Sequence, residues 1–108
     1  MLDLKQIVDE VKILIETFRK SECFKECIFD QVVEEEKRYR LIIYFPNCIG
    51  ELMINEPEYS PYYFVKFEAL ADISNNPVLI ISWYAKKSDT LRDILSHLTR
   101  VFNCAVKY

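Results

Sequence analysis

The fold is decided by the stretch Arg-Leu-Ile-Ile-Tyr-Phe at residues 40–45, which Pro46 ends. Its side chains are apolar on both alternating faces, a pattern typical of a strand that is covered on both sides. We therefore predict that this stretch is the middle strand of a sheet. A second apolar run, at residues 78–84, predicts another strand of the same sheet.

Two amphipathic helices frame these strands. Over residues 4–20 apolar side chains recur at helical spacing, with Asp3 as the expected N-cap and Ile13 on the opposite side. A second stripe runs over residues 91–102 after a cap expected at Ser88 or Asp89. Residues 103–108 are expected to form a tail with a short edge strand.

The segment between the helices predicts an antiparallel sheet. Residues 27–34, 39–45, 51–55, 62–69 and 78–85 have the apolar content of strands, and residues 70–77 form a connection that ends in a turn signal, Asn-Asn-Pro. Alternation in the last strand predicts Leu79, Ile81 and Trp83 on one face. Short links favour antiparallel pairing, and the strands do not alternate regularly with helices as in parallel folds. We predict one α+β domain over residues 1–108, with about five mainly antiparallel strands and both terminal helices packed on one face of the sheet.

Composition excludes several classes of function. A single glycine, Gly50, rules out the glycine-rich loops that bind phosphates and dinucleotides. The net charge of −3 argues against a nucleic-acid surface, which usually carries a basic excess. No apolar run approaches the roughly 20 residues of a membrane span, and the N-terminal residues lack the core of a signal peptide. We therefore expect a cytoplasmic protein without nucleic acid or membrane as a partner.

The residues that could carry chemistry are few. The four cysteines, at positions 23, 27, 48 and 104, are interpreted as reduced thiols packed as small apolar groups. Their spacing does not match a zinc site, so no metal and no cofactor is expected. His97 lies one helical turn from Asp93 and near Arg100, which could orient its imidazole for base catalysis with a cysteine nearby. A structural surface pair is the simpler interpretation, and we expect no enzymatic activity.

Charge and aromatic content point instead to a protein contact. The acidic run at residues 34–36 and the carboxylates around the loop at residues 51–58 are candidates for a patch that steers a basic partner, or else solvated loop charges. Two helices cover only one side of the sheet, so an aromatic face is expected to remain uncovered unless the loop at residues 55–61 and the tail cover it. The interface candidates are Glu34, Glu35, Glu36, Glu51, Glu56, Glu58, Tyr44, Tyr62 and Phe64.

These observations favour a small acidic protein-binding module. The form we favour is an inhibitor or immunity-type protein that neutralises a basic partner such as a toxin nuclease. A chaperone-like protein, or a structural domain that forms a homodimer through its sheet face, is an alternative of the same class. A small enzyme that uses Asp93 and His97 with a cysteine is the second alternative.

Overall fold

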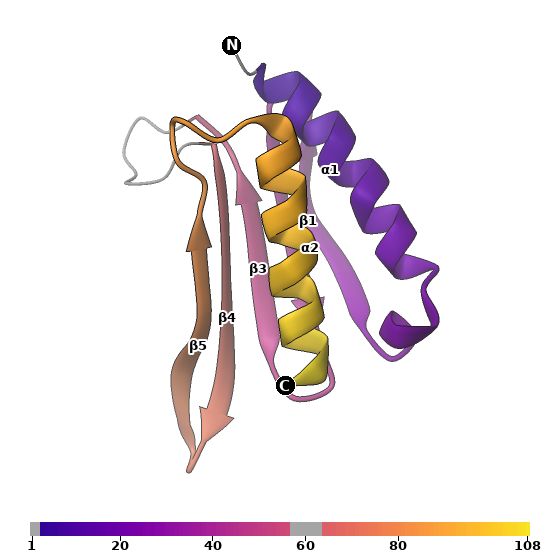
Figure 1. Cartoon of the computed structure of the whole chain (residues 1–108). Coiled ribbons are helices and arrows are strands. Elements are labelled where there is room, and N and C mark those ends of the chain that lie inside the picture. Colours follow the sequence, from indigo (N-terminus) through magenta and orange to yellow (C-terminus); the bar gives the residue numbers. More distant parts are fainter. Residues whose placement is uncertain (1–2, 57–63) are drawn as a thin grey trace.

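A computed structural model describes residues 3–56 and 64–108, and within them the chain forms two helices that pack on one face of a sheet (Figure 1). The sheet has five strands in chain order, β1-β2-β3-β4-β5, and every neighbouring pair is antiparallel. This arrangement confirms the predicted α+β class. The strands are β1 (Ile28–Glu35), β2 (Arg38–Tyr44), β3 (Ile49–Ile54), β4 (Val65–Ile73) and β5 (Asn76–Tyr84).

The first helix, α1 (Leu4–Arg19), follows the predicted stripe. Asp3 caps it by accepting a hydrogen bond from the backbone N–H of Lys5 at 3.2 Å. Ile13 is 61% exposed, as its position opposite the stripe predicts. The buried residues of the stripe are Leu4, Ile7, Val8, Val11, Ile15 and Phe18.

The second helix, α2 (Leu91–Lys107), is longer than the pattern predicts. Thr90, and not Ser88 or Asp89, is its N-cap, in a reciprocal capping box with Asp93. The expected tail with an edge strand is wrong, because Ala105 continues the buried stripe by one more turn. The end of the helix is held by Asn47, whose side chain donates to the carbonyl of Tyr108 at 3.0 Å.

The strand at residues 40–45 is not the middle of the sheet. It belongs to β2, and β3 occupies the centre. The strand β3 begins two residues earlier than predicted, at Ile49, so its first side chain joins the outer surface. The pattern missed this extension because Gly50 lacks the apolar side chain expected at a buried strand position.

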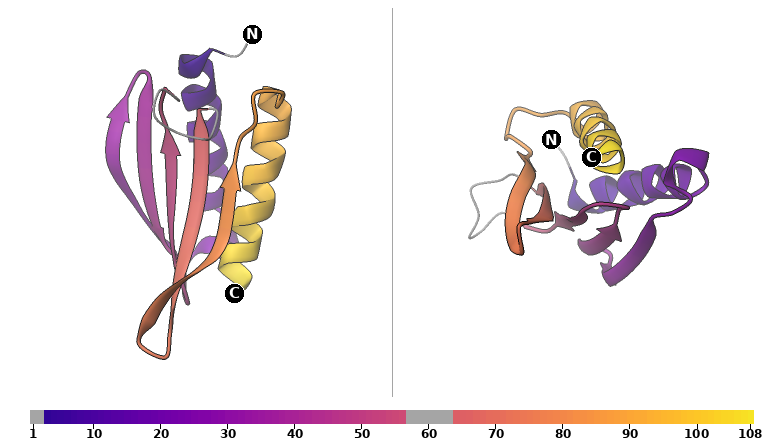
Figure 2. Two further views of the ribbon diagram at one scale, coloured as in Figure 1. Left: turned by 90° about the vertical axis from the view of Figure 1, so that its left-hand side faces the viewer. Right: turned by 90° about the horizontal axis from the view of Figure 1, so that it is seen from below.

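The predicted connection over residues 70–77 is also wrong, because β4 and β5 continue through it as a long hairpin. Ile73 pairs directly with Asn76, and the two residues between them, Ser74 and Asn75, have φ of 53° and 66°. Positive φ at both central residues is the signature of a type I′ hairpin turn. Pro77 is tolerated inside β5 because β5 is an edge strand. The hairpin extends past the ends of both helices (Figures 1 and 2).

A β-bulge in this hairpin changes which residues share a face. The register shifts at Ala69/Leu70, so Ile81 pairs with Ala69 but Leu79 pairs with Leu70. Ile81 and Trp83 therefore lie on the helix side of the sheet, and Leu79 lies on the other side. The prediction that all three share a face is wrong because strict alternation fails across a bulge.

The core between the helices and the sheet is rich in phenylalanine. Phe67 lies at its centre, with its ring centroid 5.0 Å from that of Phe102 and 6.5 Å from that of Phe45. Gly50 lies beneath two of these rings, since a Cβ there would come within 2.7 Å of Phe67 and 2.9 Å of Phe45. The only glycine of the chain is thus required by packing. Among the described residues no helix is long and apolar enough to cross a bilayer.

Candidate functional site

The sheet has a helix face, covered by α1 and α2, and an open face on the opposite side. Both views in Figure 2 show the two helices on the same side of the sheet. Within residues 3–56 and 64–108, no helix or strand lies over the open face. Side chains alternate along each strand, so every second residue projects from this face except where the register shifts, at Gln31/Val33 in β1 and at Ala69/Leu70 in the β4–β5 pair.

One row of the open face is apolar from edge to edge. The pairs Ile28–Tyr44, Tyr44–Ile49, Ile49–Leu70 and Leu70–Leu79 connect all five strands in register. We call these five residues the apolar row. Each is between 40 and 64% exposed. An exposed apolar patch that spans a whole sheet is typical of an interaction surface, whereas single exposed apolar residues are common everywhere.

The next row along the strands carries three carboxylates. Asp30, Ile42, Glu51, Glu68 and Ser82 pair across the sheet in that order, and we call them the carboxylate row. On the other side of the apolar row, Asp72 is exposed two residues beyond Leu70. The apolar row is therefore bordered by acidic groups on both sides.

Two cations lie one row further away, in a third row that contains Arg40 and Lys66. Arg40 contacts Glu51 with its Nη2 at 2.6 Å and its Nε at 2.8 Å. Lys66 Nζ lies 3.8 Å from Glu51 and 3.3 Å from Glu68. Tyr84 donates from its hydroxyl to Glu68 at 3.3 Å. These contacts engage both oxygens of Glu51 and both of Glu68, which fixes the two carboxylates beside the apolar row and partly offsets their charge.

The centre of the open face is hollowed. A depression of about 500 Å³ lies between the apolar row and the carboxylate row. Its floor and walls combine apolar side chains with two carboxylates, which is typical of a pocket that accepts one anchor side chain of a partner. The lining residues are Ile42, Ile49, Gly50, Glu51, Glu68, Leu70 and Leu79.

Of the residues proposed from sequence, the structure brings Tyr44 and Glu51 onto the open face. Phe64 lies just before β4 with a φ of 67° and packs against the core. Glu56 is exposed after β3. Glu58 and Tyr62 lie outside the described residues.

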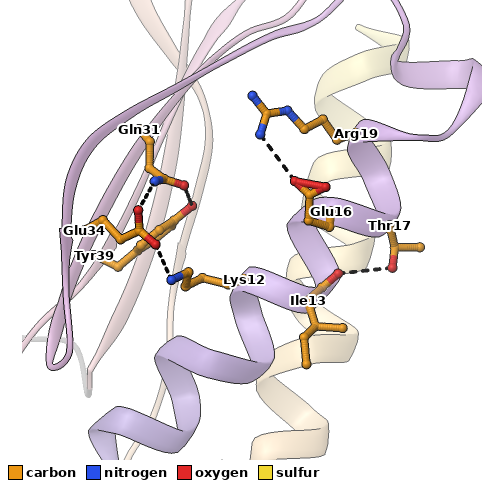
Figure 3. A network of polar contacts seen from close by, with 8 residues as sticks. All are labelled: Lys12, Ile13, Glu16, Thr17, Arg19, Gln31, Glu34 and Tyr39. Carbon is orange, nitrogen blue, oxygen red and sulfur yellow. Dashed lines mark hydrogen bonds and ion pairs between the residues drawn. The ribbon is translucent and has the colours of Figure 1, made fainter.

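The acidic run at residues 34–36 is divided between the two sides of the sheet. Glu34 projects toward the helices, where it accepts hydrogen bonds from Lys12 of α1 and from Gln31 (Figure 3). Glu35 pairs with Arg38 across the β1–β2 hairpin, and Glu36 lies in its turn. Glu34 thus joins α1 to β1, whereas Glu35 lies on the open side with Arg38, two rows beyond the carboxylate row. The three carboxylates of the run therefore do not form one patch with Glu51.

Sequence reasoning missed four members of the apolar row, namely Ile28, Ile49, Leu70 and Leu79. Ile28 and Ile49 lie at strand ends, Leu70 lies in the predicted connection, and Leu79 lies within an apolar run of β5. Only the register of the sheet brings them into one row, and a single sequence does not specify that register across two bulges. No feature of the sequence alone sets these four residues apart as one row.

The candidate catalytic pair serves the structure of α2. The carboxylate of Asp93 accepts from the backbone N–H of Thr90 at 3.0 Å, and these capping bonds lower the pKa of Asp93. The imidazole of His97 stacks on Trp83 at 5.3 Å, with Arg100 3.0 Å from its Nδ1. Asp93 is therefore engaged as a cap, and a stacked ring is a common environment for a structural histidine.

The four cysteines differ in their exposure to solvent. The cysteines are all free, with Cys48 buried and Cys23 and Cys104 exposed. Burial raises the pKa of Cys27 and of Cys48, which makes these thiols weaker nucleophiles at neutral pH. In the part of the chain that the structure describes, no group of three or more histidine, cysteine, aspartate or glutamate side chains could hold a metal ion.

Comparison with known proteins gives no family: no family model, curated protein or solved structure matches the chain. A proposal about function therefore depends on the geometry of the open face. The basic groups of that face do not form a phosphate-binding surface, because Arg40 and Lys66 are paired with Glu51.

Proposed function

We propose that this protein is a protein-binding module whose open sheet face receives a basic partner. The observation that carries the proposal is the apolar row, which spans five strands in register and is exposed along its length. Apolar contact would supply the binding energy, and the bordering carboxylates would select cationic partners and speed their association. The expected inhibitor or immunity-type activity, in the cytoplasm, is the form of this function that we favour.

The geometry favours a basic protein over a second copy of the chain. Two sheets that pack face to face usually align their strands within about 30°. A homodimer of this kind would have a two-fold axis in the plane between the two open faces. If that axis ran along the apolar row, Glu68 would face Asp72 of the copy. If it ran along β3, Glu51 would face its own copy. Like charges placed opposite one another are destabilising, so both aligned homodimers are disfavoured.

The proposal is tested by affinity capture from native lysate, at low and at moderate salt, with three forms of the tagged protein. The wild type should retain a stoichiometric basic partner that is released as the salt concentration rises. Ile49→Lys should lose this partner, because it places a charge in the middle of the apolar row. Ile13→Lys is the matched control, since Ile13 is equally apolar and exposed but lies on α1.

Two results would contradict the proposal. In one, the Ile49→Lys variant retains the partner as well as the wild type does, which would mean that the contact lies elsewhere. The other is recovery of the protein alone under all conditions, which would favour self-association. Circular dichroism of each variant checks that the fold is intact, as expected for exposed positions.

A further inference from the structure

We infer that the partner presents an amphipathic α-helix with basic flanks, and that this helix lies along the apolar row, across the strands. This inference rests on the proposed function and specifies the chemistry of the partner. It follows from three features of the open face: which backbone groups it offers, how long the row is, and where its charges lie.

The open face offers a partner only side chains. Along the apolar row, β2, β3 and β4 are each paired with a neighbouring strand on both sides, so their backbone groups there are used within the sheet. An extended peptide laid over the apolar row would find no hydrogen-bond partners for its own backbone, and burying such groups is costly. A helix satisfies its backbone internally, so it can bury an apolar stripe on this face without that penalty.

The length of the row fits a short helix. Four steps between five strands, at about 4.8 Å each, give a row about 19 Å long. A helix that rises 1.5 Å per residue covers this distance with about 13 residues. One helical turn of about 5.4 Å nearly matches the spacing between strands, so apolar residues on successive turns can meet successive strands. The central hollow then takes one of these side chains.

The charges around the apolar row determine which charged side chains the helix should carry on its two flanks. One flank would face the carboxylates of Asp30, Glu51 and Glu68, and the other would face Asp72. The cations Arg40 and Lys66 lie a row further out and offset part of the charge of Glu51 and Glu68. Four carboxylates against two cations still leave the surroundings of the row negative. Lysine or arginine on both flanks would therefore be attracted, and acidic flanks would be repelled.

The test uses a fluorescently labelled synthetic peptide of about 14 residues, with leucines at helical spacing and lysines on both flanks. The intact protein is titrated into this peptide, and binding is followed by fluorescence anisotropy. Binding should be saturable, should weaken as the salt concentration rises, and should induce helical circular dichroism in the peptide. A scrambled peptide of the same composition and a peptide with glutamates in place of lysines should both bind at least about tenfold more weakly.

Variants of the protein locate the contact. Ile49→Lys and Leu70→Lys should each weaken binding at least about tenfold, whereas Ile13→Lys should not change it. Asp30→Asn removes one charge beside the row and should weaken binding about two- to fivefold at low salt only. Binding that is unaffected by Ile49→Lys, or that is equally tight with the scrambled peptide, would overturn the inference.

The inference and the proposed function can fail separately. A photocrosslinker at position 49 should capture the partner found by affinity capture, and the captured peptide can be sequenced. A captured segment without a basic amphipathic helix would refute the helical mode and leave the protein-binding function standing. If a crosslinker at position 49 captured no partner while one at position 13 did, the open face would not be the binding surface. Both proposals would then be refuted.

Discussion

Gly50 shows how a single residue position controls the packing of this core. Its missing side chain lets the rings of Phe67 and Phe45 approach the backbone of β3. In Gly50→Ala a methyl group would meet both rings at distances that real Cβ atoms do not show, so the rings must move. We expect a loss of about 1–3 kcal/mol in the free energy of unfolding, measured by urea denaturation.

The matched control for Gly50→Ala is Ser82→Ala, at an exposed position of the open face. That variant should unfold within about 0.5 kcal/mol of the wild type. If Gly50→Ala were as stable as the control, the rings of Phe67 and Phe45 would be able to accommodate a methyl group. Close packing would then not be the reason for glycine at this position.

Tyr39 gives the protein a pH dependence that can be measured. It is buried, it donates to Gln31 at 3.1 Å, and burial with the nearby Glu34 raises the pKa of its hydroxyl from 10 to about 12. The neutral form is therefore favoured by folding. Its contribution to stability is complete below about pH 10 and is lost as the pH rises from about 10 to about 12.

The variant Tyr39→Phe removes this ionisation. We expect its free energy of unfolding to fall less steeply between about pH 10 and pH 12 than that of the wild type. Denaturant titrations at several pH values measure the two slopes. Tyr108→Phe, at an exposed hydroxyl, serves as the control, and equal slopes for Tyr39→Phe and the wild type would show that burial of Tyr39 does not govern this range.

At the scale of an element, the start of α2 depends on the capping box formed by Thr90 and Asp93. The hydroxyl of Thr90 accepts from the N–H of Asp93 at 3.2 Å, and the carboxylate of Asp93 accepts in return from the N–H of Thr90. Thr90→Ala should lower the free energy of unfolding by about 1 kcal/mol, measured as a shift in thermal midpoint.

Ser88 provides the comparison for this prediction, because the sequence pattern makes it an equally plausible cap. Ser88→Ala should leave the thermal midpoint within the range of an ordinary surface substitution. A larger effect at Ser88 than at Thr90 would mean that α2 begins earlier in solution, as the sequence suggested.

Elements with strong periodicity were predictable here, and elements shaped by register were not. The stripe of α1 and the burial of Leu41 and Ile43 follow directly from spacing. The β4–β5 hairpin could not be predicted in the same way, because its tip is exposed and β5 has no buried side that would impose alternation. Its turn was misplaced by one residue, since Ser74 and Asn75 adopt positive φ with no glycine to signal it.

For the candidate site, the sequence predicts that an uncovered sheet face exists but not which residues form it. An uncovered sheet face follows from counting two helices against five strands, and Tyr44 and Glu51 do lie on it. The apolar row does not follow from the chain, because its members come from five strands and Leu79 reaches it only through a bulge. Likewise, the acidic run at residues 34–36 was grouped with Glu51 by charge, although Glu34 bonds to Lys12 on the helix face.

At the scale of the whole molecule, the two faces of the sheet have opposite roles. The layer between the helix face and the two helices holds the buried core, which includes Phe67, Phe102 and Leu52. The open face adds little to that core but carries an apolar row between carboxylates, on a chain whose net charge is −3. We expect a surface of this composition to attract a cationic partner and to repel a copy of itself. Added salt screens both interactions, so binding of the partner should weaken while self-association should strengthen.

This opposition gives a prediction about association state. Sedimentation velocity at about 0.02 M and about 0.5 M NaCl should show a monomer at low salt, where repulsion between the carboxylates of two open faces is least screened. Any self-association should increase at the higher salt concentration and should disappear in Ile49→Lys. Binding of the basic amphipathic peptide should show the reverse dependence, weakening between the same two conditions. A dimer that is present at low salt and dissociates as salt is added would instead mean that unlike charges meet between copies, and the apolar row would then belong to a homodimer contact.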